Sequence, residues 1–170
     1  MGVLRQSAVL AAVRSCLQRD RSPVLRTYAI VALVVSIFAL VLLLLALPTW
    51  MAHPSGTSAL LMLAPGLLAL GGLAVIAALV APVLLAHRRV PDPGAEPTTE
   101  FVYGLFGYAV VVALYAALII SAPEGARGDP PSGLEPLIEP LYGLHPLVGI
   151  VPPVVVVGLL LLVDRRFVTA

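Results

Sequence analysis

The 170-residue sequence contains no lysine, one cysteine and one tryptophan, and it is poor in charge of either sign. Charged residues make up 11% of the chain and hydrophobic residues 60%, whereas a soluble domain is about 25% charged and about 45–50% apolar. So few charges do not cover the surface of a soluble domain of this size, and disorder requires low hydrophobicity and high charge. The composition therefore predicts an all-α integral membrane protein.

All ten basic residues are arginines, which is typical of a GC-rich genome and favours a prokaryotic source and its plasma membrane. The single cysteine, Cys16, forms no internal disulfide and builds no metal site by itself. It is either a palmitoylation site, if the source is a eukaryote, or an inert small hydrophobic residue.

Four stretches are long and apolar enough to cross a bilayer, which takes roughly 20 residues of helix. They cover residues 28–47, 59–86, 101–122 and 144–163. The fourth contains Pro152 and Pro153, so we expect either a kinked helix or an irregular entry over residues 144–151 that packs against protein. Residues 28–163 are thus predicted to form a four-helix transmembrane domain, followed by a short cytoplasmic tail, 164–170.

The arginines lie almost entirely in segments that a four-span topology places on one side of the membrane. Only Arg127 falls on the other side. Short loops rich in arginine stay cytoplasmic, so both termini are predicted to be inside. The nine residues that set this topology are Arg5, Arg14, Arg19, Arg21, Arg26, Arg88, Arg89, Arg165 and Arg166.

Residues 1–27 precede the first span and combine arginines with apolar positions at helical spacing. Arginines interrupt the segment, so it does not resemble a cleavable signal peptide. We expect an amphipathic helix that lies along the inner membrane interface, with its arginines near anionic headgroups. The alternative is a basic tail whose only role is to set the topology.

A weak internal repeat relates the two halves of the chain at an offset of 77 residues. Pro54-Ser55-Gly56 recurs at 131–133 and Arg88-Arg89 recurs at 165–166, and 13 of the 36 positions 54–89 are identical. Two duplicated helical hairpins are one interpretation. Chance is the other, because the chain is rich in leucine, alanine, valine and glycine.

Small residues on two spans suggest where helices pack, since helices in lipid associate through close approach of small side chains. We expect a face of the second span to meet a face of the third within a helical bundle. The residues of these two faces are Gly71, Ala74, Ala78 and Ala81 on the second span and Gly104, Gly107, Tyr108 and Tyr115 on the third. Buried tyrosine hydroxyls would then take carbonyl acceptors near a proline.

No Asp, Glu, Arg or Lys lies within the four predicted spans. Pumps and ion-coupled transporters carry ionisable groups at that depth, so this pattern disfavours them. Ser36 and Ser121 have no base at their depth, which disfavours membrane-embedded catalysis. We therefore expect a protein that is not an enzyme, with no cofactor and no nucleic-acid partner.

His53 and His145 are both predicted on the outer side, which makes them candidate ligands for a metal or haem. Each is followed by proline, a pattern more typical of turns. The outer segment 123–143 is rich in proline and carboxylates and has apolar positions at 134, 137, 138 and 141. It is either a solvated loop, a segment resting on the membrane interface or plugging the bundle, or a docking surface for another protein.

Three functions remain compatible with this pattern. The first is a non-catalytic accessory or structural subunit, which acts through other membrane protein subunits or as a homo-oligomer within the lipid bilayer. The second is a small oligomeric transporter or channel for a neutral or hydrophobic solute. The third is a metal- or haem-binding subunit built on the outer histidines.

Overall fold

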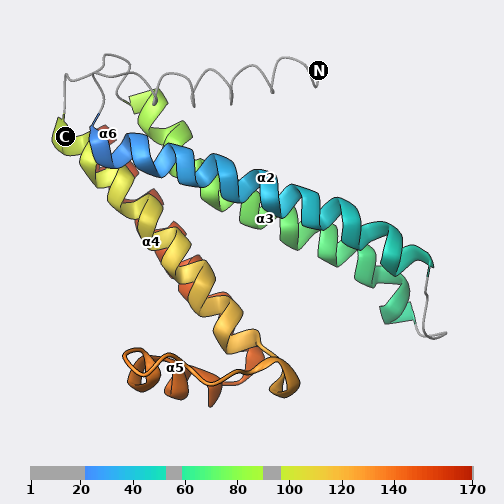
Figure 1. Cartoon of the computed structure of the whole chain (residues 1–170). Coiled ribbons are helices and arrows are strands. Elements are labelled where there is room, and N and C mark those ends of the chain that lie inside the picture. The colour runs from blue at the N-terminus through green and yellow to red at the C-terminus, as the bar shows by residue number, and fades with distance from the viewer. Residues whose placement is uncertain (1–21, 53–58, 90–96, 170) are drawn as a thin grey trace. The chain divides into compact units, whose positions relative to one another are not determined.

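The computed structural model describes residues 22–52, 59–89 and 97–169, and all regular elements within these ranges are helices (Figure 1). The long helices are α2 (Pro23–Ala52), α3 (Ala59–Arg89), α4 (Pro97–Ser121) and α6 (Val151–Thr169). The short ones are η1 (Glu124–Ala126), α5 (Glu135–Tyr142) and η2 (Pro146–Ile150). The predicted amphipathic helix lies in residues 1–27, of which 1–21 are outside the described part. Four helical segments are long and apolar enough to cross a membrane.

The long helices extend beyond the predicted spans and include charged residues at their ends. Arg26 lies in the first turn of α2, Glu100 in the first turn of α4, and Asp164 near the end of α6. Hydropathy marks where apolar side chains stop, whereas backbone hydrogen bonding continues for another turn or two. Pro23 and Pro97 are first residues of their helices, a position where the missing N–H costs nothing.

By contacts the chain divides into two compact units, Met1–Gly107 and Tyr108–Ala170. In the first unit α2 and α3 lie side by side as an antiparallel hairpin (Figure 1). Among the less exposed positions, one set on each helix repeats at spacings of four and three residues, the pattern of helices that pack at a shallow angle. They are residues 25, 29, 32, 36, 39 and 43 on α2 and 72, 76, 79, 83 and 86 on α3.

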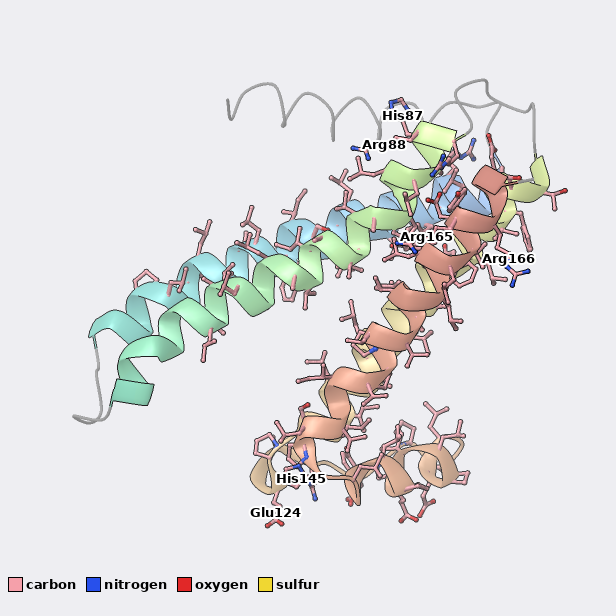
Figure 2. All side chains as sticks on the ribbon, turned by 180° about the vertical axis from the view of Figure 1, so that it is seen from behind. His87, Arg88, Glu124, His145, Arg165 and Arg166 are labelled. Atoms are coloured by element: carbon pink, nitrogen blue, oxygen red, sulfur yellow. The ribbon has the colours of Figure 1, made fainter. Side chains whose placement is uncertain are left out.

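In the second unit, the C-terminal part of α4 runs beside α6 (Figures 1 and 2). Pro152 and Pro153 fall in the first turn of α6, where they do not kink the helix. The residues before them form η2, which packs on α4: a Cβ on Gly149 would lie 2.9 Å from the Ala117 carbonyl oxygen. Residues 146–150 thus form a 3-10 helix that leads directly into α6, and the prolines do not kink the α-helix.

Of the glycine pairs that the 77-residue offset matches, Gly72 and Gly149 mark a close approach in both units, whereas nothing lies within 4 Å of a Cβ on Gly66. A Cβ on Gly72 would lie 3.0 Å from the side chain of Leu43 on α2. Gly149 meets Ala117 and Ser121 on α4. Each glycine thus contacts the preceding long helix. At the 77-residue offset Leu43 corresponds to residue 120, which lies between the two residues that Gly149 contacts, Ala117 and Ser121.

Candidate functional site

An open groove of about 250 Å³ lies between α2 and α3. Its lining is apolar except for Ser36, whose Oγ is buried and has no hydrogen-bond partner among the described residues. The groove forms where small side chains on α2 leave space between the two backbones. The lining residues are Ala29, Ala32, Leu33, Ser36, Ile37, Leu40, Leu73, Ile76, Val80 and Val83.

Tyr28 of α2 lies near the end of this hairpin that carries the arginines, and it contacts both α3 and α4. Its hydroxyl donates a 2.6 Å hydrogen bond to the carbonyl oxygen of Leu79, and the ring is fully buried. Leu79 lies three residues before Pro82, whose missing N–H would have bonded the carbonyl of Ala78, the residue before Leu79. The Tyr28 ring also packs against Gly107 of α4, where only a hydrogen leaves room for it. A tyrosine hydroxyl therefore does find a carbonyl near a proline, although the residue is Tyr28 and not one of the tyrosines of α4 singled out from the sequence.

Glu100 is fully buried although its side chain is ionisable, and it reaches the N-terminus of α2. Its Oε2 accepts a 2.6 Å hydrogen bond from the backbone N–H of Ser22. Ser22 is the N-cap residue of α2, because its carbonyl accepts the first helical bond, from the N–H of Arg26. In a capping box the glutamate that binds this N–H lies three residues further along the same helix. Here that position is Leu25, and the carboxylate comes from α4 instead.

Arg127 organises the opposite end of α4, in the second unit. Its Nε donates a 3.1 Å hydrogen bond to the carbonyl of Ala122, directly after the helix end. The guanidinium also lies over the ring of Tyr142, 5.4 Å from the centroid, at the end of α5. Close by, the Ser121 hydroxyl donates to the carbonyl of Pro146 at 3.3 Å. These contacts hold both ends of the segment that contains α5 against the end of α4.

Of the two candidate metal ligands, only His145 lies within the described residues. His145 is exposed, and its Nδ1 accepts a 3.3 Å hydrogen bond from the N–H of Leu147, as the N-cap of η2. His53 lies outside the described residues. Within the described ranges, no three His, Cys, Asp or Glu side chains form a group that could hold a metal ion.

The predicted packing residues fall in different environments. Gly104 and Gly107 meet α2 at the backbone of Leu25 and the ring of Tyr28. Gly71 and Ala74 are exposed, and the face of α3 that packs on α2 runs through Gly72, Leu79 and Val83. The remaining residues are half-buried (Ala78, Ala81 and Tyr108) or exposed (Tyr115).

The topology-setting arginines that the structure describes all lie at helix ends. Arg26 begins α2, and Arg88 and Arg89 end α3. Figure 2 shows Arg165 and Arg166 at one end of α6, with Glu124 and His145 near its other end. Arg5, Arg14, Arg19 and Arg21 lie outside the described residues.

Sequence reasoning did not single out Tyr28 or Glu100. In the sequence, Tyr28 is the first residue of the first predicted span, and Glu100 lies directly before the third. A weak signal existed for Glu100, since an acidic residue in a first turn is favoured by the helix dipole. Its partner at Ser22 is 78 residues away and left no local pattern.

Comparison with known proteins identifies one family. The model named Domain of unknown function (DUF8056) matches residues 4–168. No curated protein and no solved structure matches the chain. Because the match covers nearly the whole length, through both compact units, the chain belongs to the DUF8056 family.

Proposed function

We propose that this chain is an integral protein of the plasma membrane that crosses the bilayer four times, with both termini in the cytoplasm. The proposal is supported by four helices of sufficient length and hydropathy. It is also supported by the arginines: the start of α2, the end of α3 and the end of α6 would share the cytoplasmic side. The matched glycines 72 and 149 favour two duplicated hairpins as the origin of the four spans.

Within the membrane, the proposed role is that of a non-catalytic accessory or structural subunit that acts through other membrane proteins or further copies of itself. The observation that carries this role is the large apolar surface left uncovered by the chain. In the most apolar stretch of each span only 6%, 17%, 28% and 11% of the residues are buried, in chain order. Such faces contact lipid or other helices, and small residues such as Gly71 and Ala74 on an exposed face suit close helix association.

A second function, a small oligomeric transporter for a neutral or hydrophobic solute, is favoured by the groove between α2 and α3. Its apolar lining and single hydroxyl at Ser36 suit a hydrophobic molecule with one polar group. Replacement of Ser36 by leucine would fill the groove while leaving the exposed faces of both helices unchanged.

Topology is tested by labelling single cysteines in a Cys16→Ser background. Asp129→Cys should react with a membrane-impermeant maleimide in intact cells, and Asp92→Cys only after the cells are permeabilised. Equal labelling of both in intact cells would overturn the proposed topology.

The role is tested by two measurements on the protein in lipid. If it is an accessory subunit, crosslinking in native membranes should trap the same partner in a fixed ratio, and pure protein in proteoliposomes should move no solute. Flux of hydrophobic solutes that is lost in Ser36→Leu would instead support the transporter. Absence of any fixed-ratio complex, including one with a second copy, would contradict the accessory role.

A further inference from the structure

Helix α5 presents an apolar strip that the rest of its unit leaves uncovered. At helical spacing, Leu134, Leu137, Ile138 and Leu141 share one side of α5, and Glu135 and Glu139 lie on the other. Ile138 is buried, which anchors the helix to its own unit. Leu137 is 66% exposed and Leu134 is 46% exposed. The apolar side of α5 is therefore buried at Ile138 and exposed at Leu134 and Leu137. A further apolar surface is needed to cover these two leucines.

The position of α5 along the chain limits what that surface is. The segment begins at the end of α4 and leads back into η2, which is packed on α4 through Gly149. Arg127 binds the Ala122 carbonyl and covers Tyr142, and Ser121 binds the Pro146 carbonyl. Both ends of the α5 segment are therefore held at the end of α4, and Figure 1 shows α5 turned away from the axis of α4 there.

We propose that α5 is an interfacial helix that lies in the outer leaflet, with Leu134 and Leu137 inserted at the boundary between headgroups and acyl chains. This inference rests on the proposed membrane topology, which puts the end of α4 at the outer surface. Leu147 and Ile150, at the start of the fourth span, are exposed like the leucines of α5. Exposed apolar side chains therefore lie both on α5 and at the start of the span that follows it.

The net charge of the segment that contains α5 indicates whether it binds anionic or neutral headgroups. Residues 123–143 carry four carboxylates and one arginine, a net charge of −3. Anionic headgroups would repel such a segment, whereas basic amphipathic helices are attracted to them. Insertion of α5 therefore depends on apolar burial, and a neutral phosphatidylcholine surface is sufficient.

The test places spin labels on three single cysteines in the Cys16→Ser background, in phosphatidylcholine nanodiscs. Leu137→Cys and Glu139→Cys probe the two sides of α5, and Val112→Cys, which is exposed in α4, is the reference within a span. Oxygen dissolves in the hydrocarbon and a nickel chelate stays in water. We expect oxygen to relax the labels at 112 and 137 more strongly than nickel does, and the reverse at 139.

The outcomes separate the two proposals. If the label at 137 is as accessible to nickel as that at 139, while 112 remains in hydrocarbon, α5 does not enter the leaflet and this inference is wrong. If the label at 112 is itself accessible to nickel, α4 does not cross the bilayer, and the proposed membrane topology is wrong. Addition of anionic phosphatidylglycerol should not draw residue 137 deeper, and deeper insertion would contradict the charge argument.

Discussion

At the scale of single residues, the first unit depends on side chains that bridge distant parts of the chain. Tyr28 and Glu100 are both fully buried, and each gives or receives a hydrogen bond at 2.6 Å to the backbone of another helix. In a bilayer no water replaces a lost partner, although measured hydrogen bonds between membrane helices average only about 0.6 kcal/mol. The packing around these bonds therefore matters as much as the bonds themselves.

Gly107→Ala should destabilise the protein by about 1–3 kcal/mol, because the added methyl overlaps the Tyr28 ring and overpacks a filled site. Gly71→Ala is the matched control on α3, since nothing lies within 4 Å of its Cβ position. There alanine is the better helix former by about 1 kcal/mol, so stability should hold or rise. Thermal unfolding midpoints in detergent measure both, and an unchanged midpoint for Gly107→Ala would refute the contact.

Glu100→Ala should cost about 1–3 kcal/mol, because the Ser22 N–H loses its acceptor. Glu100→Gln keeps an oxygen at the same position and should retain most of the stability. The effect is expected at the start of α2, so amide hydrogen exchange of residues 22–26 should rise in the alanine variant and change little in the glutamine variant. Equal exchange in both variants and the wild type would show that Glu100 does not cap α2.

At the scale of elements, the two halves of the chain differ in helical structure where the 77-residue offset aligns them. Residues 59–89 form one continuous helix, α3, whereas the residues 77 positions later are divided among α5, η2 and α6. The prolines explain the difference: Pro146, Pro152 and Pro153 occupy the positions of Ala69, Val75 and Ile76. Each proline removes a backbone donor, so the α-helix starts afresh at Val151.

Arg127→Ala should loosen α5 without disturbing α4 or α6. It removes the hydrogen bond to Ala122 and the contact with Tyr142, together worth about 1–2 kcal/mol. Hydrogen exchange should rise over residues 123–142 and stay constant over 108–120. Arg127→Lys keeps the charge but not the bond geometry, and it should fall between the alanine variant and the wild type. Uniform exchange across the second unit would contradict this local role.

The sequence predicted the four long apolar helices because hydropathy and length alone decide them. It missed the helix ends, since backbone hydrogen bonding continues through Arg26 and Asp164 after the apolar pattern stops. The contact of α3 with α2 through Gly72 was not predicted, because Gly71 and Gly72 are equally small and only the partner Leu43 distinguishes them. The cap at Ser22 depends on a residue in another helix, which no local pattern contains.

At the scale of the whole molecule, charge and apolar surface are separated along the helices. Charges lie in the connections and the outermost turns, and large apolar side chains such as Leu118 and Leu70 remain exposed between them. A protein that spans a bilayer requires this separation, with apolar surface across the hydrocarbon core and charge outside it.

Neutralising the five N-terminal arginines, 5 to 26, to glutamine should produce a mixed population in which some molecules insert with the opposite orientation. Four arginines then remain on the proposed cytoplasmic side, against Arg127 alone on the outer side. The charges next to the first helix usually dominate orientation, so their loss should have the larger effect. Arg165→Gln with Arg166→Gln is the control, and it should leave the orientation unchanged. Labelling of Asp129→Cys in intact cells reads out both, and full labelling in the N-terminal variant would contradict the assignment.

The bond between Ser22 and Glu100 also sets an order of events during synthesis. Its two residues lie 78 positions apart, so ribosomes that add about 5–20 residues per second make Glu100 roughly 4–16 s after Ser22. During that interval α2 and then α3 are synthesised, while the first turn of α2 still lacks its acceptor. The hairpin of α2 and α3 is therefore complete in sequence before α4 supplies the carboxylate that caps it.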